Sequence, residues 1–170
     1  MFDETPPIKL SPIFEGPQDV GERPDKITLV IPVEPLAVQS VRVSKFGLYQ
    51  PASVKKWKKL VAEHARQQFP WEPYSGPLEV SYAEYIFQLP KSVTKKVRTR
   101  VESGETFYMD RRGDLMDNLN KATMDALAGI IFTDDANIVR CGGLRKVYGT
   151  EPKITITFQN LEGKVNLIPK

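Results

Sequence analysis

The most informative part of the chain is residues 114–139, which read DLMDNLNKATMDALAGIIFTDDANIV. The first half of this stretch predicts a helix from Asp114 to about Ala128, ended by Gly129. Successive residues of an α-helix are about 100° apart, and this spacing separates a polar stripe from an apolar stripe that we expect to face a sheet. The polar stripe contains Asp114, Asp117, Asn118, Lys121 and Asp125, and the apolar stripe contains Leu115, Leu119, Ala122 and Ala126.

Two interpretations fit the acidic residues of this stretch. Asp114 can be the N-cap of the helix, with Asp117 in the first turn near the positive end of the helix dipole. Asp134 and Asp135 can likewise be ordinary turn residues. Alternatively, the two helix carboxylates and Asp135 supply the hard oxygen ligands that suit Mg²⁺, which can activate a water at a scissile phosphate. With one cysteine and one histidine in the chain, a usual zinc site is excluded.

The rest of the sequence predicts an α+β domain, in which helices pack on one mixed sheet. Strands are expected at 27–31, 78–89 and 153–158, a hairpin at 41–43 and 48–50, and short apolar segments at 130–133 and 137–139 around the acidic turn. Helices are expected at 51–69 and 92–101, with a loop at 102–112. We expect one domain at 26–160, a flexible proline-rich arm at 1–25 and a tail at 161–170.

The charge is distributed unevenly, which is more informative than the net value of +3. Basic runs lie in the first helix, in the second helix and directly before the acidic helix. Each run can be a solvated helix face, but three runs around an acidic cluster favour a surface that binds phosphates. The residues that we expect to contact DNA are Lys91, Lys95, Lys96, Arg111 and Arg112.

The chain also resembles the RusA-type Holliday junction resolvases. The family pattern is an aspartate pair followed by DNLxK, DAL, a hydrophobic strand and DDxQV, and residues 117–121, 125–127 and 134–139 match it here. The likeness continues upstream in Ile31-Pro32, Pro35-Leu36, Gln39 and Tyr49, in WKKL at 57–60 and in LPKS at 89–92. It covers about residues 27–158.

The resemblance implies a RusA-like fold and an Mg²⁺-dependent endodeoxyribonuclease, with Mn²⁺ as a substitute metal, that resolves four-way DNA junctions in recombination and repair. It implies Asp117 and Asp135 as metal ligands and Lys121 as a lysine that faces the phosphate. Paired symmetric cuts need two active sites, so a homodimer is expected. The sequence has no apolar run that could span a bilayer, and we expect a cytoplasmic protein of a bacterial or phage-infected cell, without membrane or small-molecule partners.

One departure from the family concerns the first ligand. The family usually spaces its first two aspartates as DxD, whereas this chain has DxxD and places Leu115 at the expected position. We take Asp114 as the first ligand, because residues three apart share a helix face and a one-residue irregularity at the helix start could absorb the difference. Asp110 is the alternative. A second, conservative departure is Asn137, where glutamine is common.

Other features leave alternatives open. His64 is expected to have a packing or surface role rather than to be a general base, and Cys141 to be a small apolar filler rather than a nucleophile. Phe107 and Tyr108 can be core residues or can stack on unpaired bases at a junction. Two rival functions are the cleavage of flaps or forks, and the binding of branched DNA without catalysis.

Overall fold

The computed structural model describes residues 21–37, 42–44, 47–49, 51–111 and 113–168. In this part of the chain, six strands form one mixed sheet with the order β1-β8-β4-β7-β5, and β6 pairs with β4 beside that path. The strands are β1 (Lys26–Ile31), β4 (Leu78–Gln88), β5 (Phe107–Tyr108), β6 (Ile138–Cys141), β7 (Leu144–Gly149) and β8 (Lys153–Asn160). The expected α+β class and single mixed sheet are confirmed.

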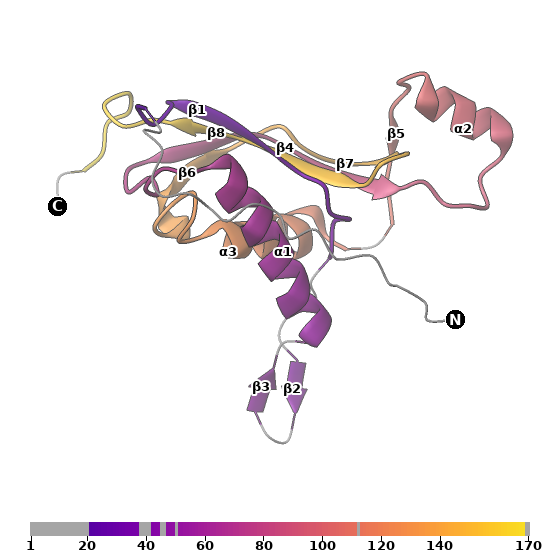
Figure 1. Cartoon of the computed structure of the whole chain (residues 1–170), viewed down its shortest axis with the longest axis horizontal. Coiled ribbons are helices and arrows are strands. Elements are labelled where there is room, and N and C mark those ends of the chain that lie inside the picture. The colour runs from indigo at the N-terminus through magenta and orange to yellow at the C-terminus, as the bar shows by residue number, and fades with distance from the viewer. Residues whose placement is uncertain (1–20, 38–41, 45–46, 50, 112, 169–170) are drawn as a thin grey trace, which may run out of the picture.

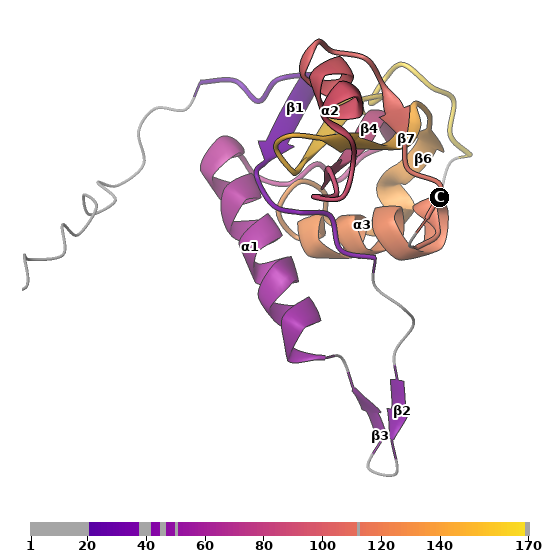
Figure 2. The same cartoon turned by 90° about the vertical axis from the view of Figure 1, so that its right-hand side faces the viewer.

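Helices cover one face of this sheet (Figures 1 and 2). They are α1 (Ala52–Gln68), the short α3 (Lys121–Leu127) and a π-helical segment, η1 (Leu115–Asn120), that leads directly into α3. The helix α2 (Lys95–Glu102) lies beyond the β5 and β7 end of the sheet, away from α1 and α3 (Figures 1 and 2). None of the helices in the described ranges is long and apolar enough to cross a membrane.

The core lies between α1, α3 and the covered face of the sheet. Apolar residues of α1 recur every three or four positions, and those of β4 alternate, so that each element buries one side. Full burial of a large apolar side chain contributes about 1.5–3 kcal/mol, which makes this layer the main source of stability. Its largest fully buried members include Tyr85, Leu29, Ile31, Leu119, Leu127, Ile131, Phe132, Ile154, Ile156 and Phe158.

The strands β6 and β7 run one after the other along β4, both parallel to it. They are separated by Gly142-Gly143. Gly143 has φ +61°, and a Cβ there would lie 2.9 Å from the Ser81 carbonyl oxygen, so the turn requires glycine. We did not expect β7 or the two-residue β5, which lies in the predicted loop.

Residues 130–133 are not the strand-like segment that their composition suggested. They form turns, in which Phe132 makes isolated bridges to Tyr74 and Ala128. Ile130, Ile131 and Phe132 are nevertheless buried. Their apolar character therefore reflects core packing in the connection after α3, and no strand ladder. The expected hairpin is present as β2 (Arg42–Ser44) and β3 (Gly47–Tyr49), which pair antiparallel.

A glutamine from α1 occupies the outer edge of β1. The side-chain amide of Gln68 donates from Nε2 to the Val30 carbonyl, and its Oε1 accepts the Val30 amide, both at 2.9 Å. Both backbone groups of an edge residue are thereby satisfied without another strand.

The segments that flank the domain meet beside the start of β1 and the end of β8. The Asp25 carbonyl accepts a hydrogen bond from the Asn160 amide at 2.6 Å, and the Asp25 carboxylate pairs with Lys164 Nζ, also at 2.6 Å. Arg23 lies over the ring of Tyr74, 4.3 Å from its centroid. Residues 161–164 and residues 21–25 of the predicted arm at 1–25 thus contact the domain, while residues 1–20 of that arm lie outside the described residues.

Candidate active site

The acidic helix begins at Asp114, which has the extended backbone of an N-cap. Its Oδ1 accepts hydrogen bonds from the amides of Met116 at 2.7 Å and Asp117 at 2.8 Å. These two amides, together with the charge of Lys146, hold the pKa of the Asp114 carboxyl below its ordinary value, against a smaller effect of desolvation. The N-cap interpretation of Asp114 is therefore confirmed, and the carboxylate is ionised at neutral pH.

The first turn after this cap is π-helical, which corrects the expectation of a regular α-helix. The Asp114 carbonyl accepts the Leu119 amide at 3.1 Å and the Asn118 amide at 3.3 Å, and the Lys121 amide bonds to the Met116 carbonyl. A turn closed by bonds between residues five apart holds more residues than an α-helical turn, so it rotates by less per residue than assumed. The irregularity lies at the helix start, where we expected that a one-residue irregularity could absorb the DxxD spacing.

The separation into a polar and an apolar side survives this irregularity. Leu119, Ala122 and Ala126 are buried and Leu115 is half-buried, as expected. Asp117 and Lys121 are exposed, and Asn118 is half-buried. Asp125 is held by Lys58 of α1, whose Nζ lies 2.9 Å from its Oδ2.

Asp135 is the first residue of a 3₁₀ turn, η2 (Asp135–Asn137), that follows α3. The neighbouring Asp134 caps this turn through a hydrogen bond from the Ala136 amide, at 2.8 Å. Asn137 accepts from the Asp134 amide at 2.9 Å and donates to the Ser75 carbonyl at 2.8 Å. Of the two aspartates, Asp134 therefore builds the turn, while Asp135 is exposed at its start.

The structure brings the predicted ligands together only in part. Asp114 and Asp117 lie in one turn, whereas Asp135 comes from the separate turn η2. Among the residues that the structure describes, no three His, Cys, Asp or Glu side chains are grouped so that they could hold a metal ion. Mg²⁺ is commonly held by one or two carboxylates together with waters and substrate phosphates. The carboxylate donors at the helix start fit that mode of binding, although a closed protein cage is not formed.

A pocket of about 660 Å³ lies beside the start of this helix. Gly113, with φ +75°, forms part of its wall, and a Cβ there would overlap the side chain of Ala37. The close approach requires glycine at this position and packs the segment after β1 against the acidic turn. The other lining residues are Glu34, Pro35, Leu36, Phe87, Asp114 and Asn118.

Two residues that the sequence did not single out reach this turn from the sheet. Lys146 of β7 donates from Nζ to the Gly113 carbonyl at 2.8 Å. Tyr85 of β4 donates from its hydroxyl to Oδ1 of Asn120 at 3.1 Å. The signal for Lys146 would have been a lysine on the covered face of a strand, which could be recognised only once β7 and its register were known.

The predicted DNA contacts fall into two groups. Lys91, Lys95 and Lys96 are exposed in α2 and the turn before it, and Arg111 is exposed in the loop before the acidic helix. Because α2 lies away from α3, the structure does not place its lysines beside Asp117 (Figures 1 and 2). Arg112 lies outside the described residues.

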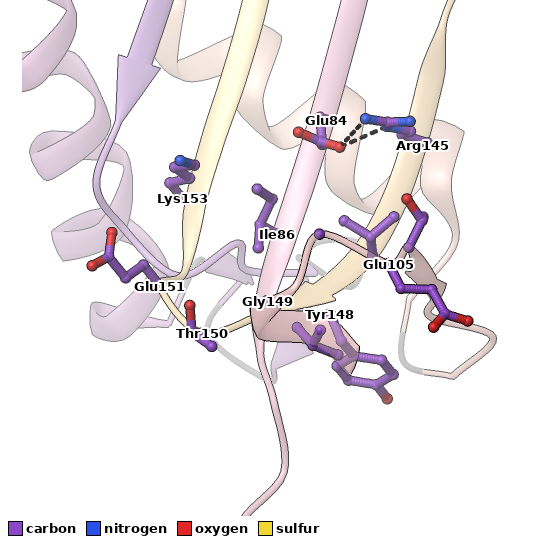
Figure 3. A pocket seen from close by; sticks show the side chains of 13 residues that line it. Glu84, Ile86, Glu105, Arg145, Tyr148, Gly149, Thr150, Glu151 and Lys153 are labelled. Carbon is purple, nitrogen blue, oxygen red and sulfur yellow. Dashed lines mark hydrogen bonds and ion pairs between the residues drawn. The ribbon is translucent and has the colours of Figure 1, made fainter. Parts of the chain in front are cut away.

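A second pocket, of about 290 Å³, lies on the opposite face of the sheet near the end of α2 and holds none of the predicted site residues (Figure 3). Glu84 of β4 and Arg145 of β7 form an ion pair there, with 2.6 Å between the carboxylate and the guanidinium (Figure 3). Ile86 and Lys153 line the same pocket. This face is therefore separate from the acidic turn.

The remaining alternatives are also placed. Tyr108 has 68% of its surface exposed and is not a core residue, whereas Phe107 is half-buried with the Arg100 guanidinium 5.1 Å from its ring centroid. Cys141 is exposed on β6, so the expectation of a buried filler is wrong. Partial desolvation raises the pKa of its thiol, which argues against a reactive thiolate. His64 is half-buried in α1.

Comparison with known proteins gives two findings. The family model described as "Endodeoxyribonuclease RusA" matches residues 32–159, a range that includes Asp114, Asp117, Lys121 and Asp135. The chain is also 27% identical over 122 residues to a Bacillus subtilis (strain 168) protein described as "Uncharacterized protein YqaN". That alignment covers 72% of this chain and 84% of the relative.

Proposed function

This chain belongs to the RusA endodeoxyribonuclease family, and from that membership we propose that it resolves four-way DNA junctions by paired, Mg²⁺-dependent hydrolysis of phosphodiesters on two opposed strands. The observation that carries the proposal is the family match over 32–159, which contains all four candidate catalytic residues. The exposed carboxylate of Asp117 and the ionised carboxylate of Asp114 support it, because both lie in one turn at the surface.

Each residue has a distinct part in the proposed mechanism. Asp117 and Asp114 would hold the cation from the helix side, and Asp135 of η2 would be the third carboxylate ligand. When bound, Mg²⁺, for which Mn²⁺ is the expected substitute, supplies an activated water and offsets charge on the scissile phosphate. Lys121, exposed at the start of α3, offsets further negative charge on that phosphate.

The substrate class follows from charge and symmetry. We propose that DNA is held mainly through its phosphates, by Arg111 and Arg112 near the acidic turn and by Lys91, Lys95 and Lys96 at the other end of the sheet. Opposed cuts in a four-way junction require two active sites, and a homodimer with two-fold symmetry provides them. The proposed setting is DNA recombination and repair in the cytoplasm of a bacterial or phage-infected cell.

The direct test compares substrates at equal protein concentration. A mobile and an immobile four-way junction, a flap, a fork and a linear duplex are incubated with Mg²⁺ or with a chelator. We expect symmetric paired nicks in the four-way junctions with Mg²⁺, and no cleavage with the chelator or by Asp117→Asn. Preferential cleavage of the flap or fork would show that these structures, and not four-way junctions, are the substrate.

One observation favours a second candidate, a protein that binds branched DNA without cutting it. No three carboxylates are grouped in the described ranges, and Oδ1 of Asp114 is engaged by two backbone amides. This candidate predicts tight junction binding without Mg²⁺-dependent cleavage at any protein concentration. A catalytic protein loses cleavage, but not binding, in Asp117→Asn.

A further inference from the structure

Tyr85 and Lys146 lie opposite each other where β4 and β7 pair in parallel. Their neighbours in the same register, Glu84 with Arg145 and Ile86 with Val147, line the pocket on the open face of the sheet (Figure 3). Side chains alternate between the two faces of a strand. Tyr85 and Lys146 therefore belong to the other face, where η1 and α3 pack.

One side chain contacts the residues just before the N-cap of η1, and the other contacts the last residue of η1. Lys146 Nζ donates to the Gly113 carbonyl at 2.8 Å and to the Arg111 carbonyl at 3.4 Å, just before the N-cap Asp114. The hydroxyl of Tyr85 donates to Oδ1 of Asn120, the last residue of η1, at 3.1 Å. Adjacent positions on two paired strands thus hold the residue before the cap and the residue before Lys121.

The Tyr85–Asn120 and Lys146–Gly113 contacts are partly shielded from water, whereas the Lys146–Arg111 contact is exposed. Tyr85 is 0% exposed, and Lys146 is half-buried. When one partner of a partly buried hydrogen bond is removed, water replaces the lost bond only incompletely, so its loss is costly. Single π turns are rare and are frequently found at functional sites. Contacts from neighbouring elements can keep such a turn from relaxing to α-helical bonding.

We propose that Lys146 and Tyr85 are positioning residues that fix the two ends of η1 and so keep Asp114, Asp117 and Lys121 in the register of the π turn. The effect of the two contacts on the geometry of η1 does not depend on the proposed function. That the register serves catalysis rests on the proposed function.

Loss of the hydrogen bonds of Lys146 to the backbone and loss of its positive charge should have opposite effects on cation binding. Lys146 carries a positive charge near Asp114, so removing that charge alone would strengthen the binding of a divalent cation to the acidic turn. Loss of positioning would weaken it, because groups that orient ligands typically contribute about ten-fold or more in metal affinity. The direction of the change therefore distinguishes a positioning residue from a nearby charge.

The test uses the full DNA-free chain and four variants: Lys146→Met, Lys146→Arg, Tyr85→Phe and the matched control Lys153→Met. Lys153 is a half-buried strand lysine on the opposite face of the sheet. Amide hydrogen exchange is followed at Leu119 and Lys121, with the Ile156 amide of β8 as the reference for global unfolding. Mn²⁺ binding is measured in parallel by electron paramagnetic resonance.

We expect Lys146→Met and Tyr85→Phe to speed exchange at Leu119 and Lys121 by about ten-fold, with Ile156 unchanged. Lys146→Met should weaken Mn²⁺ binding by about ten-fold. Lys146→Arg should restore most of the protection, because a guanidinium can donate to the same carbonyls. Lys153→Met should behave as wild type.

Exchange at η1 that is unchanged in Lys146→Met, or raised only together with Ile156, would overturn the proposal. So would tighter Mn²⁺ binding by that variant. If the wild-type protein cuts no junction but the variants show the expected exchange pattern, the proposed function is refuted. The positioning role of Lys146 and Tyr85 on η1 then still holds. If the wild-type protein cuts junctions but exchange in Lys146→Met is unchanged, only the positioning role of Lys146 is refuted.

Discussion

Lys58 of α1 and Asp125 of α3 form an ion pair, 2.9 Å between Nζ and Oδ2, that joins the two helices on the covered face of the sheet. Asp125 lies on the polar side of the acidic helix, but this ion pair gives it a structural role. Asp125→Asn should therefore cleave junctions at the wild-type rate. Because both side chains are partly exposed, the free energy of unfolding should fall by less than about 1 kcal/mol, measured by urea denaturation. A large loss of cleavage would return Asp125 to the active site.

The exposed carboxylates Asp117 and Asp135 should be essential for cleavage but not for binding. Asp117→Asn and Asp135→Asn should each abolish nicking of a four-way junction. Junction affinity should stay the same or improve, because a negative charge near the phosphates is removed. Gel-shift and nicking assays on the same preparations measure the two effects. Full cleavage by either variant at saturating Mg²⁺ would remove that residue from the proposed site.

Asp114 and Asp110 compete for the role of first ligand. The side chain of Asp110 is 87% exposed in the loop, whereas Asp114 lines the pocket at the helix start. We expect Asp114→Asn to be inactive and Asp110→Asn to be near wild type. Asn caps helices about as well as Asp, so Asp114→Asn should keep most of the wild-type stability at neutral pH. The opposite pattern of activities would assign the ligand to the loop.

The lowered pKa of Asp114 gives a pH-dependent contribution to stability. A carboxyl whose pKa is lower in the folded protein stabilises the fold above its unfolded value and loses that effect as the pH falls through the folded value. Any stability advantage of wild type over Asp114→Asn should therefore be present at neutral pH. It should shrink as the pH falls below the ordinary value of 3.8. Thermal melts of both proteins across this range measure the difference, and a difference independent of pH would show that the charge has no part.

Lys121 should affect the rate of cleavage more than binding. Lys121→Ala should slow single-turnover cleavage by about ten-fold or more, which corresponds to about 1.4 kcal/mol of barrier. Junction affinity should change little, because one phosphate contact is a small share of the total. Lys121→Arg should restore only part of the rate, since a planar guanidinium does not replace a compact ammonium. Wild-type cleavage with a slightly lower melting temperature would make Lys121 a surface residue only.

The sequence predicted those features of the acidic helix that depend on burial alone. Leu119, Ala122 and Ala126 lie in the core because apolar spacing determines which side faces the sheet. The π turn could not be predicted in this way. Its ends are held by Tyr85 and Lys146, which are distant in sequence and act through hydrogen bonds that no local pattern encodes.

The missed strand β7 has a related cause. Its charged residues Arg145 and Lys146 break the apolar alternation that identifies a strand. Each is accommodated by a partner: Glu84 across the pairing for Arg145, and backbone carbonyls for Lys146. Conversely, 130–133 looked like a strand because burial in an irregular connection selects the same side chains. For both β7 and residues 130–133, the composition indicates only how buried the segment is. Whether the segment is a strand depends on its backbone hydrogen bonds.

The hydrogen bonds between Gln68 and Val30 bear on how two copies of this protein could assemble. Sheets commonly associate by pairing their outermost strands, and an unprotected edge also invites aggregation. A second molecule could extend the sheet past β1 only by displacing Gln68 from both backbone groups of Val30. Dimerisation by a continuous sheet is therefore disfavoured on that side, because it would cost both hydrogen bonds. A two-fold interface on another surface would instead leave α1 attached to β1 of its own subunit.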